Sequence, residues 1–162
     1  MSDARVKLRA MTVADAEWLV EQHRQLYARE AGFDHTFGDL VRDIVADFMA
    51  DHDPIRERAM IAVKDDRRLG SIFCVRQDQN TAKLRLFLLV PGARGLGLGH
   101  MLLTACMDFA RQSGYTRMVL WSHKSHVAAC ALYARHGFRL TDEQPVHSFG
   151  VDLISQNWEI NL

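Results

Sequence analysis

The segment VPGARGLGLGHMLL, residues 90–103, decides the fold of this chain. It follows one apolar run and enters another, and Gly95, Gly97 and Gly99 stand at the junction. Glycine leaves backbone N–H groups uncovered, and the first turn of a helix adds a partial positive charge. The segment therefore predicts a strand, a loop and a helix that together bind a phosphate or pyrophosphate group.

Two familiar phosphate-binding motifs do not fit this segment. The dinucleotide pattern G-x-G-x-x-G fails, because its last position holds another residue whether counting starts at Gly95 or at Gly97. A P-loop fails because no Lys-Ser or Lys-Thr pair follows the glycines. The pattern that remains is R-x-x-G-x-G, from Arg94 to Gly99.

Hydrophobic periodicity around the segment predicts one βαβ crossover, with a strand over 82–90, a helix over 98–112 and a strand over 117–123. The first of these strands ends in the unbroken apolar run LFLLV, which predicts a bulge or a ligand contact. T-x-x-D signals at Thr12 and Thr36 are expected to open two early helices. The other expected elements are strands over 6–11, 59–65, 70–77, 138–143 and 156–162, and helices over 13–31, 37–49 and 125–136.

Composition limits the function classes. A chain of 162 residues that is 48% hydrophobic is expected to form one domain over residues 1–162. Lys plus Arg and Asp plus Glu balance at 20 each, so no overall field predicts a nucleic acid or a membrane as partner. The three cysteines form no CxxC pair, and no apolar stretch has the length of a signal peptide or a membrane span. We therefore expect a soluble, cytoplasmic protein with reduced thiols.

The glycine pattern and a later tyrosine segment, LYARHGF at 132–138, resemble the GCN5-related N-acetyltransferases (GNAT). Longer stretches at 28–49, 82–99, 132–140 and 147–162 resemble the acetyltransferase half of bacterial proteins in which a MarR-type regulator is fused to such an enzyme. The resemblance implies an α/β (α+β) acyl-CoA N-acyltransferase fold, with a mixed, mostly antiparallel sheet of about seven strands and about four flanking helices. It also implies an enzyme that moves an acetyl group from acetyl-CoA to a primary amine by direct attack in a ternary complex.

The resemblance assigns residues to the acyl-CoA. Main-chain groups of Leu88, Leu89 and Val90 would bond the pantetheine arm, and one N–H there would polarise the thioester carbonyl. Backbone amides of residues 95–100 would hold the pyrophosphate, with the charge of Arg94 beside them. The predicted cofactor-binding residues are Leu88, Leu89, Val90, Arg94, Gly95, Leu96, Gly97, Leu98, Gly99, His100, His123, Ala129 and Tyr133.

Tyr133 stands where the family has its general acid, and a phenol of high pKa can protonate the departing CoA thiolate. The group that takes the proton of the amine is left open. Glu30 and His123 are the leading candidates, with Asp34, His35 and a relayed water beside them. No cysteine lies in a recognisable nucleophile context, which disfavours a covalent acyl-enzyme route.

Two departures from the family keep an alternative open. His100 stands where an Arg or Lys is expected, and His123 stands where an Asn is expected. A CoA-binding sensor with little catalytic activity is therefore the alternative, and a nucleotide-binding regulator is disfavoured by the failed fingerprints. No metal site is predicted, because the eight histidines form no H-E-x-x-H or Cys/His spacing. The sequence does not identify the small-molecule or peptide amine, and the resemblance leaves a homodimer open.

Overall fold

The computed structural model describes residues 5–162 and has one seven-stranded sheet in the order β1-β2-β3-β4-β5-β7-β6. Neighbouring strands are antiparallel except β4 and β5, which are parallel, so the predicted mixed, mostly antiparallel sheet is confirmed. The strands are β1 (Lys7–Ala10), β2 (Arg58–Lys64), β3 (Arg67–Arg76), β4 (Thr81–Leu89), β5 (Arg117–His123), β6 (Arg139–Ser148) and β7 (Val151–Asn161). The helices are η1 (Val13–Asp15), α1 (Ala16–Ala31), α2 (His35–Ala50), η2 (Pro91–Ala93), α3 (Leu98–Gln112) and α4 (Val127–Arg135).

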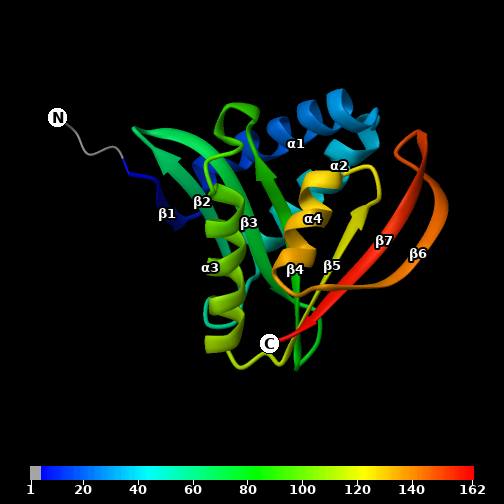
Figure 1. Ribbon diagram of the computed structural model, residues 1–162. Helices are drawn as coiled ribbons and strands as arrows, with labels where there is room; N and C mark the ends of the chain where they lie inside the picture. The colour runs from blue at the N-terminus through cyan, green and yellow to red at the C-terminus, as the bar shows by residue number, and fades with distance from the viewer. Residues whose placement is uncertain (1–4) are drawn as a thin grey trace.

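Helices cover both faces of the sheet: α3 and α4 lie over one face, and α1 and α2 lie over the other (Figure 1). Leu102 of α3 packs with Ile72 in one apolar core, and Leu19 of α1 and Val41 of α2 pack with Phe73 in a second. Ile72 and Phe73 are consecutive residues of β3, so the alternation of the strand supplies both cores. No helix within residues 5–162 is long and apolar enough to cross a membrane.

The parallel strands β4 and β5 separate after a short stretch of pairing. Their register covers residues 81–83 of β4, and the remainder of β4 runs on without a β5 partner. The register between β3 and β4 shifts between Ser71 and Phe73, and Leu86 has a positive φ of 47°. The Ser71 hydroxyl donates to the carbonyl of Leu86 at 2.7 Å, which fixes the bulge in place. The bulge predicted in LFLLV is confirmed, and the sheet is open beside it.

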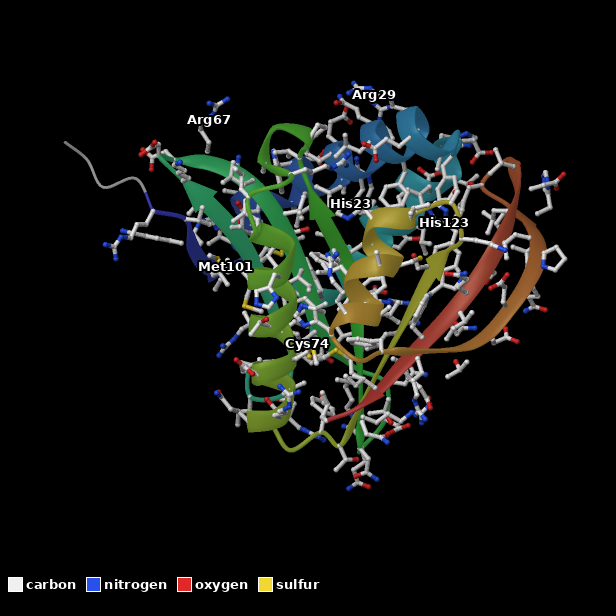
Figure 2. All side chains as sticks on the ribbon, viewed as in Figure 1. His23, Arg29, Arg67, Cys74, Met101 and His123 are labelled. Atoms are coloured by element: carbon white, nitrogen blue, oxygen red, sulfur yellow. The ribbon has the colours of Figure 1, made fainter. Side chains whose placement is uncertain are left out.

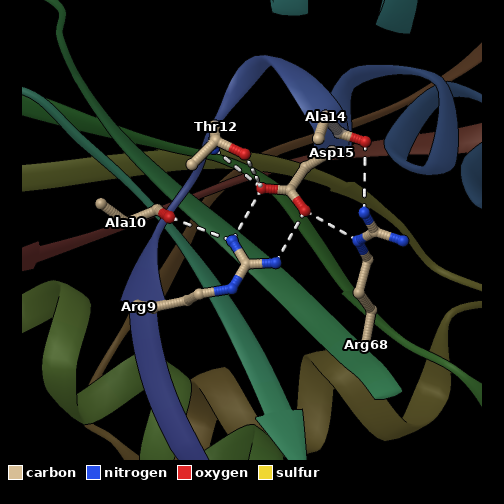
Figure 3. A network of polar contacts seen from close by, with 6 residues as sticks. All are labelled: Arg9, Ala10, Thr12, Ala14, Asp15 and Arg68. Atoms are coloured by element: carbon tan, nitrogen blue, oxygen red, sulfur yellow. Dashed lines mark hydrogen bonds and ion pairs between the residues drawn. The ribbon is translucent and has the colours of Figure 1, made fainter. Parts of the chain in front are cut away.

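A buried carboxylate fixes the N-terminal strand to the rest of the fold (Figure 3). Asp15 is fully buried, and its oxygens accept hydrogen bonds from Arg9 at 2.8 Å and Arg68 at 2.7 Å. The Thr12 N–H also donates to Asp15 at 2.8 Å, as the predicted cap requires. These contacts, led by the Arg9 hydrogen bond, hold the pKa of Asp15 well below its usual range. Asp15 therefore joins β1, η1 and β3.

Several predicted boundaries were wrong; β3, for example, begins at Arg67 and not at residue 70. The helix expected to open at Thr36 begins at His35, because Asp34 is the N-cap and its side chain accepts from the Thr36 N–H at 3.0 Å. The last two strands are longer than predicted and form a hairpin that turns at Phe149 and Gly150, with φ values of 55° and 77°. The bounds predicted for α3 and β5 are confirmed.

Candidate active site

The glycine loop leaves a row of unused backbone donors. Gly95 and Gly97 have φ values of 79° and 78°, which favour glycine, and Gly97 is the N-cap of α3. Among the described residues, none accepts a hydrogen bond from the N–H groups of residues 95–100, although the Met101 N–H bonds to the Gly97 carbonyl at 3.1 Å. A Cβ built on Gly95 or Gly97 would meet nothing within 4 Å. The loop therefore offers uncovered donors and open space, which fit a pyrophosphate group.

The loop forms one wall of a cavity of about 540 Å³, here called the loop cavity. Its other walls come from α1, the end of β4 and α4. The predicted cofactor-binding residues that line it are Leu88, Leu89, Arg94, Gly95, Gly97, Gly99, His100, His123 and Ala129. Those that do not are Val90, Leu96, Leu98 and Tyr133. The Leu96 side chain points to solvent and that of Leu98 is buried in the core, so only their backbone amides face the loop.

One predicted cofactor contact needs correction. The Val90 N–H donates to the Leu69 carbonyl at 2.9 Å, and the Val90 carbonyl accepts from the Ala93 N–H at 2.9 Å. Both main-chain groups of Val90 therefore have internal partners, because β4 ends against β3 and η2 begins there. Leu88 has the same alternation as Val90 and pairs with Ser71 of β3, so among the predicted residues only Leu89 turns its main-chain groups to the open side of β4.

A second cavity of about 460 Å³, here called the aromatic cavity, lies between the sheet and the helices α1 and α2. Its walls include Phe37, Trp121 and Phe149, together with Tyr133 from α4. The two cavities share four lining residues, Tyr27, Phe87, His123 and His126. They meet beside the place where β4 and β5 separate.

Tyr133 is placed to keep its proton. It is 4% exposed, and its ring lies 6.2 Å from that of Phe87 and 5.8 Å from that of Phe138. Its hydroxyl makes no hydrogen bond with another described residue. Burial raises the pKa of Tyr133 well above its usual value, so the phenol stays protonated at neutral pH.

His123 is placed to stay neutral. It is 4% exposed, its Nδ1 lies 2.7 Å from the Ser125 hydroxyl, and its ring stacks on His126 with centroids 5.4 Å apart. Burial, and then repulsion from His126, lowers the pKa of His123 from 6.5 to about 4. Burial also lowers the pKa of His126, whereas the nearby Glu30 carboxylate acts in the opposite direction. A neutral imidazole is thus available at the junction of the cavities.

Glu30 and Arg94 face each other across the loop cavity. The Arg94 guanidinium binds both carboxylate oxygens of Glu30, at 2.6 Å and 3.1 Å. The structure thus brings a predicted base and a predicted phosphate-binding residue together. Asp34 and His35 lie at the start of α2 and line neither cavity.

Residues 16–138 match the profile of the acetyltransferase (GNAT) family, which is most of the chain. The chain belongs to this family. No curated protein matches it.

Solved structures of other acetyltransferases have the same fold. This acetyltransferase is 25% identical to one from Streptococcus agalactiae 2603, with a TM-score of 0.80 and 100% of both chains covered. A putative acetyltransferase from Salmonella typhimurium, solved with its cofactor acetyl-CoA, is 20% identical, with a TM-score of 0.79 and 97% of this chain and 94% of that one covered. Spermidine N-acetyltransferase from Vibrio cholerae, in complex with CoA and spermine, is 16% identical, with a TM-score of 0.74 and 96% of this chain and 95% of that one covered. The family match shows that the chain is an acetyltransferase, and these solved structures share its fold.

Sequence analysis missed several residues of the site in this acetyltransferase. Tyr27 falls within the helix predicted over 13–31 and carries no site signal in the sequence, yet it lines both cavities, and burial raises its pKa to about 12. His126 has no site signal in the sequence either, yet it lines both cavities. Lys83 and Arg85 alternate with the apolar Leu84 and Leu86 in the strand predicted over 82–90, and they line the aromatic cavity. The sequence does contain a signal for these two residues, because two cationic side chains stand in a strand that is otherwise apolar.

Proposed function

We propose that this acetyltransferase transfers the acetyl group of acetyl-CoA to a primary amine by direct attack in a ternary complex. The observation that carries the proposal is the meeting of the two cavities at Tyr27, Phe87, His123 and His126. A thioester held in the loop cavity and an amine held in the aromatic cavity would react at this junction. Holding both reactants there lowers the entropic cost of their encounter.

Backbone groups would hold the coenzyme. The amides of residues 95–100 would bind its pyrophosphate, since they have no acceptor within the described chain. Leu89 lies on the side of β4 that has no β5 partner, where its main-chain groups would pair with the pantetheine amides as a neighbouring strand would. When bound, acetyl-CoA supplies the activated acyl group.

Tyr133 and His123 would divide the proton transfers. Tyr133 stays protonated and lines the aromatic cavity, so it would protonate the departing thiolate. His123 stays neutral and lies at the junction, so it would take the proton of the amine. Glu30 would act through its charge on His126 while Arg94 holds both its oxygens.

The cysteines support a route without an acyl-enzyme. Cys74 and Cys106 are fully buried, and Cys130 lines neither cavity. Burial also raises the pKa of Cys130, which keeps it as an unreactive thiol. Direct attack by the amine therefore fits the arrangement best.

The proposal is tested by mixing the protein with acetyl-CoA and a broad panel of primary amines. Release of CoA thiol together with an acetylated amine, identified by mass, is expected. Intact-protein mass spectra taken with acetyl-CoA alone should show no added acetyl group. An acetylated cysteine would contradict direct attack, and CoA binding without turnover of any amine would favour the sensor alternative.

Three further predictions from the sequence are independent of the proposed reaction. They are the closer resemblance to the acetyltransferase half of MarR fusions, the cytoplasmic location and the homodimer. Size-exclusion chromatography with light scattering tests the last of these, and a monomer at all protein concentrations would contradict it.

A further inference from the structure

Two cations lie in the floor of the aromatic cavity. Ala82 and Leu84 of β4 are buried in the core beneath α3. Strand alternation therefore turns Lys83 and Arg85 to the opposite face, where both line the aromatic cavity. Both are partly buried, and neither makes a hydrogen bond or an ion pair with another described residue.

The surroundings of these cations are unfavourable in the protein alone. Burial lowers the pKa of both side chains, and Arg85 also repels Lys83. Asp47 on α2 raises the pKa of Arg85 but forms no ion pair with it. None of the described residues that line the aromatic cavity carries a carboxylate. Two partly desolvated positive charges without a counterion destabilise the folded protein, and an anionic ligand bound between them would relieve this repulsion.

The other partly buried arginines of the described chain have partners within it. Arg9 and Arg68 bind the carboxylate of Asp15, and Arg56 donates to the Gln79 carbonyl and lies over the Tyr115 ring. Lys83 and Arg85 differ from these residues, because the carboxylate that would pair with them is missing from the described chain. Since they face a cavity, a ligand can supply it.

We propose that the aromatic cavity binds a primary amine with a carboxylate at the far end of an apolar body, and that Lys83 and Arg85 bind this carboxylate. The inference rests on the proposed function, which places the amine at the junction of the cavities. A strand rises about 3.3 Å per residue, so Arg85 and Lys83 lie roughly 10 and 16 Å before Leu88 along β4. This spacing separates the carboxylate from the amine, and Phe37 and Phe149 stand where they can pack against the apolar body.

The charge of the cavity also defines what it rejects. A polyamine would bring a second ammonium group toward Lys83 and Arg85, with no acidic side chain in the cavity wall to receive it. The acceptor class inferred here therefore differs from that of the Vibrio cholerae spermidine N-acetyltransferase, whose structure holds spermine.

Calorimetry on the protein saturated with CoA tests this inference without requiring turnover. The matched ligands are para-aminomethylbenzoate and benzylamine, which differ by one carboxylate, with spermidine as a polycation. We expect the acid to bind about 10- to 100-fold more tightly than benzylamine, the range for a hydrogen-bonded charge pair. Lys83→Met and Arg85→Met should each remove most of this preference, whereas Lys64→Met, at an exposed position on β2, should retain it.

The outcomes separate the inference from the function on which it rests. Equal binding of the acid and benzylamine, tighter binding of spermidine, no binding of the acid, or a preference that survives both substitutions would each overturn the inference. In all of these cases CoA still binds, and the proposed function is unaffected. Absence of CoA binding by the unmodified protein would overturn the proposed function itself. Unchanged melting temperatures and CoA affinities show that the variants are folded.

Discussion

Burial changes the pKa values of two side chains of the site in opposite directions. It raises the pKa of Tyr133, which keeps the phenol protonated, and it lowers the pKa of His123, which keeps the imidazole neutral. One cause thus yields a proton donor and a proton acceptor within one site at neutral pH. Pairs of groups with pKa values displaced in this manner are typical of acid–base catalysis.

Tyr133→Phe tests the donor. Loss of the hydroxyl should lower kcat by about 10²- to 10⁴-fold, because the thiolate then departs without protonation. The dissociation constant for CoA should stay within about twofold, because the ring and its packing remain. Steady-state kinetics and calorimetry measure the two quantities.

Tyr115→Phe is the matched control for this substitution. Its hydroxyl bonds to the Arg56 carbonyl at 2.9 Å, and Tyr115 lines neither cavity. Its kcat should match that of the unmodified protein. Equal activity of the two variants would remove Tyr133 from the proposed mechanism.

At the scale of elements, the loop before α3 combines a required backbone conformation with a required open space. Gly97 has a φ of 78° and caps the helix, and no described atom lies within 4 Å of the position that a methyl group on Gly97 would occupy. A side chain at this position would strain the backbone, and it would also enter the space that the ligand is proposed to occupy. Residue identity there affects both stability and ligand binding.

Gly97→Ala should weaken acetyl-CoA binding by at least about tenfold and destabilise the fold by about 1–2 kcal/mol, because alanine resists a positive φ and its methyl group enters the phosphate site. Gly92→Ala is the matched control, because its methyl group also meets open space but Gly92 is not among the residues with positive φ. Calorimetry and urea unfolding measure both effects. Normal CoA affinity in Gly97→Ala would contradict the assigned role of the loop.

Asp15→Asn tests the junction of β1, η1 and β3. The amide can still accept from the Thr12 N–H, but it weakens two charged hydrogen bonds, so a loss of about 2 kcal/mol in the free energy of unfolding is expected. Glu17→Gln, which breaks an exposed pair with Arg42, should change stability far less. Urea titrations of both variants give the comparison, and equal stability of the two would contradict a structural role for Asp15.

The sequence predicted most elements because their signals are local. The glycines before Leu98 and the turn after Gln112 define α3 directly, so its bounds were confirmed. The end of β6 could not be found in this way, because that strand is largely exposed and has no apolar face to mark its continuation to Ser148. The meeting of Tyr27 with His123 depends on tertiary packing of α1 against β5, which no local pattern records.

At the scale of the whole molecule, the separation of β4 and β5 creates a site between two independent cores. The core beneath α3 supports the loop cavity, and the core beneath α1 and α2 forms the wall of the aromatic cavity. His23 and His123, labelled in Figure 2, both line the aromatic cavity. Stability and function therefore depend on overlapping sets of buried polar residues.

Stability should fall in mild acid because of these histidines. The His23 Nδ1 donates to the Leu19 carbonyl at 2.7 Å, and burial lowers the pKa of His23 from 6.5 to about 4. Between these pH values the unfolded chain binds a proton that the folded chain does not, so the free energy of unfolding decreases as pH falls, by about 3 kcal/mol for this residue. In His23→Phe, unfolding titrations should show a flatter pH profile over this interval. Tyr115→Phe, which removes no group that titrates in this interval, should keep the original profile, and an identical slope in all three proteins would contradict the prediction.

The central claim is that the backbone amides of residues 95–100 bind the pyrophosphate of acetyl-CoA. The most direct measurement is a titration of the ¹⁵N-labelled protein with acetyl-CoA, followed through its amide ¹H–¹⁵N resonances. The largest shifts are expected on residues 95–100 and on Leu89, and they should saturate with one equivalent bound. Saturable binding that leaves these amides unmoved, or no binding at millimolar acetyl-CoA, would contradict it.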